Sequence, residues 1–247
     1  MARAYVFVAA MLIAVNVFAA ADYAREKRWN DEITPTLVVG DAVYLAQPSG
    51  HKFLALYTQA AKPRAAVIIV HGLGVHPDWA LIGALRSALP DEGYTTLSVQ
   101  MPVLAADAAA EDYTALFTDS AERLTAAIAF LHSKSAHKIG LVSHSMGARI
   151  SNYFLATYGG RDVDAWVSIG ISSGEFANIS NLKMPVLDIY GQQDFPVVRQ
   201  NAYKRAATLR ALKGSAQIEV PGADHYFAGH ENELAKRIGQ FLDQRLR

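Results

Sequence analysis

This chain of 247 residues contains no cysteine. Disulfide bonds, a thiolate nucleophile and thiolate metal sites are therefore excluded, whichever compartment the protein occupies. The chain also lacks an excess of charge of either sign, because 23 Lys and Arg residues balance 23 Asp and Glu residues. This balance gives no reason to expect a nucleic acid or an anionic membrane surface as a partner.

Apolar residues make up 51% of the sequence and charged residues only 19%. This composition is typical of a packed globule and argues against disorder. The length suits one sizeable core, and the sequence shows no internal repeat or low-complexity tract. We therefore expect one main domain.

The N-terminal segment has the pattern of a targeting sequence. Arg3 supplies a positive charge, residues 5–18 are almost entirely apolar, and Ala19-Ala20-Ala21 offers a small-residue cleavage site. The pattern predicts a signal peptide over residues 1–21 and a periplasmic or secreted protein, with no stable membrane insertion after cleavage. The alternative is an uncleaved N-terminal membrane anchor, because this apolar stretch nearly reaches the length that spans a bilayer.

Residues 22–36 are rich in charged and polar side chains, and we expect a solvated leader with about one helical turn. The main domain is predicted over residues 37–247. It begins with strand-like runs at residues 37–39, 42–45 and 53–57, joined by turn residues, which is typical of an antiparallel start.

Strands then alternate with helices. The run at residues 65–70 is apolar at every position, as expected for a strand buried on both faces of a parallel sheet. Further strands are predicted at residues 94–99, 139–142, 165–169, 186–190 and 216–220, and helices at about 79–89, 113–133, 145–158, 198–212 and 231–246. The alternation predicts an α/β fold with a mostly parallel, twisted sheet of about eight strands and helices on both faces. Residues 171–184 are too few for a large lid, so the site should be open.

The stretch Ser143-His144-Ser145-Met146-Gly147 follows a predicted strand and opens a predicted helix. It differs at one position from the Gly-x-Ser-x-Gly nucleophile elbow, a sharp turn that lifts one serine out of the sheet. Ser145 would be the lifted residue, and Ser143 stands where the first glycine usually stands. The alternative is an ordinary turn whose serines cap the helix.

Two more residues of catalytic type follow predicted strands. Asp194 follows the strand at 186–190, and His225 follows the strand at 216–220. In an open parallel sheet, functional groups collect at the carboxyl ends of strands. Ser145, Asp194 and His225 also occur in the chain order nucleophile, acid, histidine.

These motifs resemble those of the α/β-hydrolase superfamily, and the resemblance extends from Phe53 to the C-terminus. It rests on His71-Gly72-Leu73-Gly74, the elbow, the segment Pro185 to Asp194, and Gly222-Ala223-Asp224-His225. The short, lidless chain is most similar to small esterases of the dienelactone-hydrolase type. Those enzymes use a cysteine nucleophile, however, and this chain has none.

The resemblance implies a serine hydrolase that forms an acyl-enzyme on Ser145. His225 would act as the general base and later as the acid, and Asp194 would orient the imidazole. The backbone N–H groups of Leu73 and Met146 would form the oxyanion hole. This chemistry requires no cofactor.

Several alternatives to these assignments remain. Asp188 or Asp224 could be the acid, and His230 could be the base. His71 is expected to be a structural residue that hydrogen-bonds the oxyanion loop. A metal site built from His71, His76 and Asp78 is not expected, because two of these residues are needed for the turn and the helix cap.

The residues predicted to line the substrate pocket are His144, Trp79, Met101 and Phe227, although such side chains lie in a core at least as often. We expect an exported serine hydrolase of carboxylic esters whose partner is a small ester substrate. The alternatives are an amidase or peptidase, an acyltransferase, or a non-catalytic binding protein with a hydrolase fold. The sequence predicts no oligomeric state.

Overall fold

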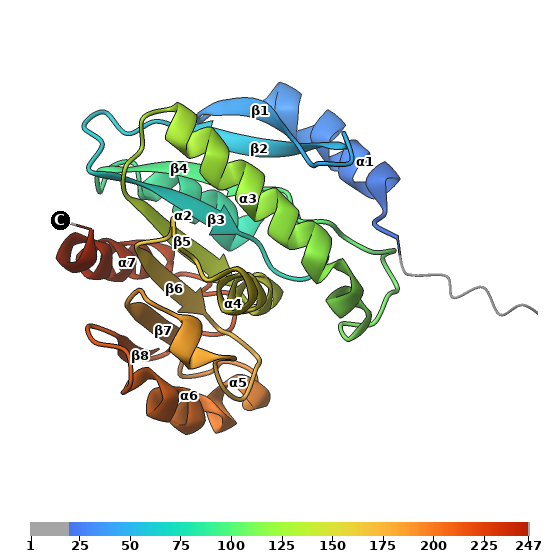
Figure 1. The fold of residues 1–247 in the computed structure, drawn as a ribbon. Coiled ribbons are helices and arrows are strands. Elements are labelled where there is room, and N and C mark those ends of the chain that lie inside the picture. Colours follow the sequence, from blue (N-terminus) through green and yellow to red (C-terminus); the bar gives the residue numbers. More distant parts are fainter. Residues whose placement is uncertain (1–19, 247) are drawn as a thin grey trace, which may run out of the picture.

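The structure, a computed structural model, describes residues 20–246, so the predicted signal peptide over residues 1–21 lies almost entirely outside the described residues. Eight strands form one sheet in the order β1-β2-β4-β3-β5-β6-β7-β8 (Figure 1). The strands are β1 (Asp41–Ala46), β2 (Lys52–Thr58), β3 (Ala65–Val70), β4 (Tyr94–Val99), β5 (Ile139–His144), β6 (Ala165–Ile169), β7 (Val186–Gly191) and β8 (Ala216–Val220). β2 is antiparallel to both of its neighbours, and β3 to β8 are mutually parallel. The predicted fold class is confirmed.

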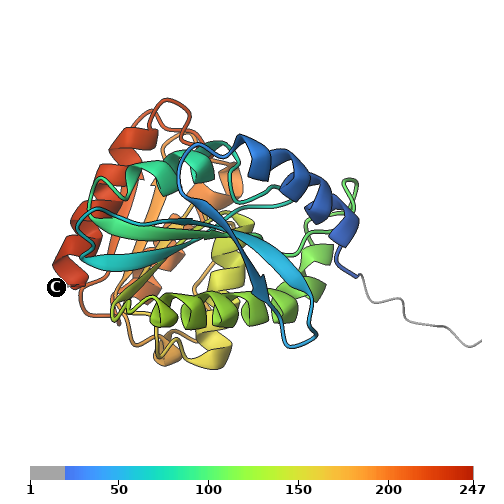
Figure 2. The ribbon, with the colours of Figure 1, turned by 90° about the horizontal axis from the view of Figure 1, so that it is seen from above.

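Helices cover both faces of the sheet (Figure 2). The α-helices are α1 (Tyr23–Ile33), α2 (Ala80–Ala88), α3 (Phe117–Ser133), α4 (Met146–Tyr158), α5 (Pro196–Gln200), α6 (Ala202–Leu209) and α7 (Glu231–Arg245), and the short 3-10 helices are η1 (Thr34–Thr36), η2 (Asp112–Leu116) and η3 (Ile179–Asn181).

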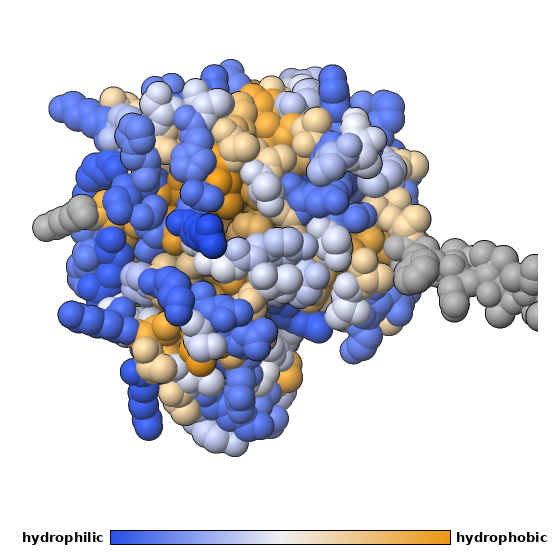
Figure 3. Space-filling view, viewed as in Figure 1, coloured by the Kyte–Doolittle hydropathy of each residue, from blue (hydrophilic) through white to orange (hydrophobic). Residues whose placement is uncertain are grey.

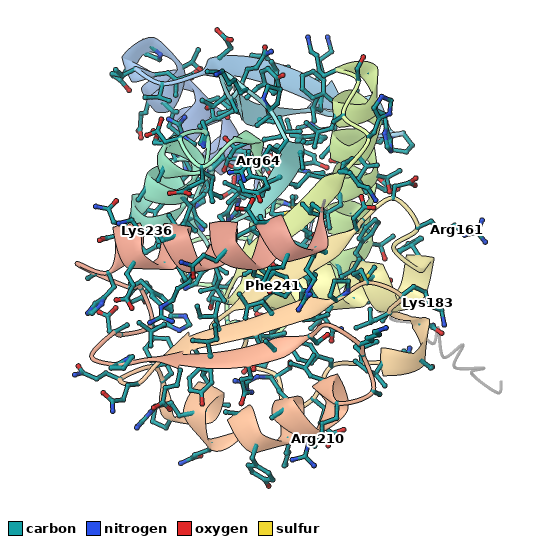
Figure 4. The ribbon with its side chains drawn as sticks, turned by 90° about the vertical axis from the view of Figure 1, so that its left-hand side faces the viewer. Arg64, Arg161, Lys183, Arg210, Lys236 and Phe241 are labelled. Atoms are coloured by element: carbon teal, nitrogen blue, oxygen red, sulfur yellow. The ribbon has the colours of Figure 1, made fainter. Side chains whose placement is uncertain are left out.

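Strand β3 shows why every one of its positions is apolar. Ile68 and Val70 belong to the core shared with α3 and α4, whereas Val67 and Ile69 belong to the core shared with α2 and α7. Successive side chains of a strand point to opposite faces, so a strand between two helical layers needs apolar residues throughout. On the α7 side, Phe241 packs onto the sheet while Lys236 lies on the exposed side of the helix (Figure 4).

The segment at residues 22–36 differs from the predicted solvated leader. It forms the helix α1, eleven residues long, capped by the Asp22 side chain, and it packs beside β2 (Figure 1). Ile33 is buried against Leu54 and Leu56 of β2, and Glu26 is only 3% exposed. The prediction was wrong because a charged composition was taken to mean solvent exposure, whereas Glu26 forms an ion pair with a buried arginine on α3.

Three local predictions also differ from the structure. Residues 37–39 are not a strand, and Val38 is 92% exposed. Asp78 does not cap α2, because its Oδ1 accepts a hydrogen bond from Arg86 Nε at 2.5 Å. The helices expected at 113–133 and 198–212 are each divided, into η2 and α3 and into α5 and α6.

Hydrophilic residues cover most of the face seen in Figure 3, with apolar residues exposed in patches between them. Within residues 20–246, no helix is both long and apolar enough to cross a membrane. The same residues contain no group of three or more His, Asp or Glu side chains placed to hold a metal ion.

Candidate active site

Ser145 lies in the turn between β5 and α4, with φ +55° and ψ −116°. Few residues other than glycine adopt such a backbone, so it is held here by its surroundings. The Ser145 N–H donates to the Ile169 carbonyl at 2.8 Å. A Cβ on Gly147 would lie 2.4 Å from the His71 carbonyl oxygen. Only glycine therefore lets α4 cross β3 this closely, as the elbow motif predicts.

Ser143, which stands in place of the first elbow glycine, is fully buried. Its Oγ accepts a hydrogen bond from Trp166 Nε1 at 2.8 Å. A glycine here would leave a buried indole N–H without this acceptor, which carries a desolvation cost. The departure from the motif thus has a structural reason within the core.

The structure brings Ser145, Asp194 and His225 together. His225 Nε2 lies 3.0 Å from Ser145 Oγ, and His225 Nδ1 lies 2.6 Å from Asp194 Oδ1. A carboxylate can only accept, so Nδ1 carries the proton and Nε2 is free to accept from the serine hydroxyl. The Asp194 carboxylate also accepts from the Phe195 N–H at 2.7 Å. The Asp194 carboxylate and the His225 ring are therefore held in place by contacts within the protein.

The alternative acids and base have other partners. Asp188 pairs with Arg205 Nε at 2.8 Å, and Asp224 accepts from the backbone of its own turn. His230 pairs with Glu233 at 3.2 Å. None of these three alternatives is hydrogen-bonded to the Ser145 hydroxyl or to the His225 ring.

Gly170, at the end of β6, was missed by the sequence analysis. It has φ +58°, and a Cβ there would lie 3.1 Å from Asp194 Oδ2 and 3.2 Å from the His225 ring. A side chain at position 170 would therefore press on both the Asp194 carboxylate and the His225 ring. The available signal was a glycine directly after a predicted strand, which marks a close approach of other groups.

Leu73 lies in the loop after β3, and Met146 directly follows Ser145 at the start of α4. Their N–H groups donate to no acceptor in the described part of the chain, so both are available to a ligand. His71 Nδ1 lies 2.9 Å from the Gly72 carbonyl oxygen, and its Nε2 accepts from the Met101 N–H at 2.9 Å. Because the peptide group is planar and trans, holding the Gly72 carbonyl directs the Leu73 N–H the opposite way.

A hollow of about 200 Å³ lies in front of Ser145. Trp79 and His144 line it, as predicted. Met101 and Phe227 do not: they are 1% and 0% exposed and lie in the two cores, one on each face of the sheet. Their prediction as pocket residues was wrong because an apolar residue after a strand can turn into the core as readily as into a cleft.

Phe195 and Tyr226 line the hollow instead. The Phe195 ring stacks on the His225 imidazole, with centroids 4.1 Å apart, and the Tyr226 ring meets the imidazole edge-on at 5.2 Å. Both aromatic residues are close to half exposed. Phe195 directly follows Asp194 in the sequence, and Tyr226 directly follows His225. This adjacency to predicted catalytic residues was the signal that could have identified them.

His144 is buried beside His225. Its Nε2 lies 2.9 Å from the His225 carbonyl oxygen. Burial, followed by the nearby His225, lowers the pKa of His144 to about 4. At neutral pH the ring is therefore uncharged, and its Nε2–H can donate to the His225 carbonyl oxygen.

Acid should destabilise the fold. Burial lowers the pKa of His71 to about 3 and that of His144 to about 4, from an ordinary value of 6.5. Below pH 6.5 the unfolded chain binds protons that the folded chain excludes, so the free energy of unfolding falls with the pH until these lower values are reached. We expect a slope of up to about 1.4 kcal/mol per pH unit for each histidine.

Urea denaturation at a series of pH values measures this slope. His71→Asn should make the profile shallower, whereas His137→Asn, at an exposed histidine, should leave it unchanged. A wild-type profile that is flat between neutral pH and the two lowered pKa values would contradict the prediction.

A comparison with models of protein families places this chain in a family. The model of the family described as "Protein of unknown function (DUF3530)" matches residues 25–121 and 110–244. A search of curated proteins found no match.

Solved structures share the fold. A lidless α/β serine hydrolase from Xanthomonas campestris is 19% identical, with a TM-score of 0.66, over 84% of this chain and 95% of that one. A dienelactone hydrolase from Anabaena variabilis is 22% identical, with a TM-score of 0.67, over 83% and 97%. Est1E from Butyrivibrio proteoclasticus, solved with ferulic acid, is 15% identical, with a TM-score of 0.68, over 83% and 99%. The chain belongs to the DUF3530 family, and its fold is that of the α/β-hydrolases.

Proposed function

We propose that this protein is an exported serine hydrolase that cleaves carboxylic esters through an acyl-enzyme on Ser145. The observation that carries the proposal is the hydrogen-bonded series from Ser145 Oγ through His225 to Asp194, with contacts of 3.0 and 2.6 Å. This series faces a hollow lined by Leu73, and the backbone N–H groups of Leu73 and Met146 have no acceptor among the described residues. A bound ester would thus meet a nucleophile, a base and oxyanion donors together.

The reaction has two halves. Ser145 Oγ attacks the ester carbonyl carbon while His225 Nε2 takes its proton, and the carbonyl oxygen becomes an oxyanion held by the Leu73 and Met146 N–H groups. The C–O bond to the alcohol then breaks, and His225 returns the proton to the leaving oxygen. Water repeats these steps on the acyl-enzyme, releasing the carboxylic acid and restoring the serine. Asp194 stabilises the imidazolium in both halves.

Esters are the substrate class that the hollow favours. Trp79, Phe195 and Tyr226 contribute aromatic rings to its wall. Aromatic walls suit an apolar acyl or alcohol group. The ferulic acid in the Est1E structure, at 15% identity, is consistent with an aromatic acid group.

Export rests on the pattern of residues 1–21, and the mass of the purified exported protein tests it: retention of these residues would indicate an anchor.

A fluorophosphonate probe tests the nucleophile. The probe forms a covalent bond only with an activated serine, so the wild-type protein should be labelled and Ser145→Ala should not. Ser180→Ala, at an exposed serine away from the hollow, serves as the matched control and should be labelled like the wild type. Mass analysis of the labelled peptide should place the adduct on Ser145.

Equal labelling of Ser145→Ala and wild type would overturn the assignment, and a folded but unlabelled wild type would favour a non-catalytic binding protein. Matched p-nitrophenyl esters and p-nitroanilides of the same acyl group then separate an esterase from an amidase. Faster release of p-nitrophenol than of p-nitroaniline would not suffice, because phenolates leave more easily. The anilide should therefore remain uncleaved even at high enzyme concentration.

A further inference from the structure

The helix α1 contacts the loop that carries Leu73. Arg25 Nη2 donates to the Gly74 carbonyl at 2.8 Å, and Arg25 Nη1 donates to the Leu104 carbonyl at 2.8 Å. Gly74 follows β3 and Leu104 follows β4, so one guanidinium joins two loops at the carboxyl edge of the sheet. The planar fork of an arginine suits two acceptors at once, and the arginine remains charged at any relevant pH.

Arg25 is itself held in place. Its backbone N–H donates to Asp22 Oδ1 at 2.8 Å, in the first turn of α1. Its guanidinium lies over the Trp29 ring, 4.7 Å from the centroid. Trp29 in turn lies 5.5 Å, ring to ring, from His76, which follows the same loop. The helix therefore contacts the loop on the C-terminal side of Leu73 at two points.

A second set of contacts reaches the N-terminal side of Leu73. Glu26 forms two hydrogen bonds with Arg123, whose Nη1 also donates to the Gln100 carbonyl at 3.0 Å. The next N–H, that of Met101, donates to His71 Nε2. His71 holds the Gly72 carbonyl, as described above. The carbonyl groups of Gly72 and Gly74, the residues on either side of Leu73, are thus both restrained through contacts that begin on α1.

We propose that α1 holds the loop that carries Leu73 in place, and that Arg25 is a positioning residue for the oxyanion donor Leu73 N–H. This inference rests on the proposed function. An oxyanion donor lowers the barrier only if it is already oriented when charge develops on the carbonyl oxygen. Without the Arg25 guanidinium, the Gly74 carbonyl is released, and the Leu73 N–H loses the fixed direction that the neighbouring peptide groups impose.

Arg25→Ala should lower kcat for a p-nitrophenyl ester by about tenfold to a hundredfold. KM should remain within about twofold, because the uncharged ester depends little on an oxyanion donor. Arg25→Lys should recover part of the loss, since one ammonium can hold only one of the two carbonyls well. Arg28→Ala is the matched control: Arg28 lies on the same helix, is exposed and has no polar side-chain partner among the described residues.

A boronic acid inhibitor gives a second measurement, because its tetrahedral adduct on serine mimics the transition state. Its inhibition constant should weaken in Arg25→Ala in proportion to the loss in kcat/KM. Titration of active sites with the fluorophosphonate corrects every rate for the folded fraction. If the corrected kcat and inhibition constant of Arg25→Ala equal those of Arg28→Ala, Arg25 has no positioning role.

Failure of this inference can be distinguished from failure of the proposed function. A wild-type protein that neither reacts with fluorophosphonate nor cleaves esters overturns the proposed function. Hydrogen exchange then still tests the restraint, because residues 72–79 should exchange faster in Arg25→Ala than in Arg28→Ala. Equal exchange in the two variants would overturn the inference whether or not the protein is an enzyme.

Discussion

Asp194→Asn should lower kcat for ester hydrolysis by about 10⁴-fold while the protein stays folded. In the proposed mechanism, His225 gains a positive charge when it takes the Ser145 proton, and the carboxylate that lies 2.6 Å from Nδ1 stabilises that charge. A neutral amide cannot do so. If its NH₂ group faces Nδ1, it also selects the tautomer whose Nε2 carries a hydrogen and cannot accept the serine proton.

Steady-state kinetics measures this loss, with circular dichroism to check the fold. Asp224→Asn is the matched control, because among the described residues the Asp224 carboxylate accepts only from the Tyr226 and Ala228 N–H groups, which an amide oxygen can also do. It should retain kcat within a few-fold. The assignment of the acid is wrong if Asp194→Asn retains a tenth of the activity, or if Asp224→Asn loses as much.

The members of the series should not act independently. Adding Asp194→Asn to His225→Ala should reduce kcat little further, because the acid acts only through the imidazole. A double variant whose loss equals the product of the two single losses would show that Asp194 acts on substrate by another route.

Glu26→Gln should lower the free energy of unfolding by about 3–5 kcal/mol. The Arg123 guanidinium is fully buried, and the Glu26 carboxylate accepts from its Nη1 and Nη2 at 2.9 and 3.1 Å. The amide retains the size of the carboxylate but not its charge, so a buried cation is left without a counter-ion. Urea denaturation measures the effect, and Glu32→Gln, exposed on the same helix, should change stability very little.

The double variant Glu26→Leu/Arg123→Met separates charge from packing. Removing both charges should cost less than removing Glu26 alone, since apolar residues of similar size can replace a buried ion pair at little cost. If Glu26→Gln is as stable as Glu32→Gln, the ion pair makes no net contribution and α1 is held by its apolar contacts.

The predicted strands agree closely with the observed ones wherever the run is buried on both faces. β3, β4 and β6, which are buried at every position, have the predicted bounds, and so does the partly buried edge strand β8. Such strands are recognisable because each position needs an apolar or small side chain whatever the neighbouring elements are. The run at residues 37–39 has the same appearance over three residues but pairs with no strand, because pairing depends on neighbours that a local pattern does not describe.

The contacts of α1 show the opposite case. Its first residues are charged, and local composition indicates solvent exposure. Whether Glu26 is exposed depends on Arg123, 97 positions further along the chain, and nothing between them signals the pairing. The contact of Arg25 with Gly74 spans 49 positions and is equally invisible to local reasoning. The role proposed for α1 could therefore arise only from the folded chain.

The sequence by itself determined the α/β alternation, the elbow serine and the order of the acid and histidine, because each depends on residue type and on position relative to the end of a strand. The tertiary structure decided which side chains face the hollow, why a serine stands in the elbow, and what holds the oxyanion loop. These depend on distances between segments remote in the chain. Met101, Phe227 and Glu26 were misplaced for this one reason: burial is a property of three-dimensional neighbours, and the local pattern records only the neighbours in sequence.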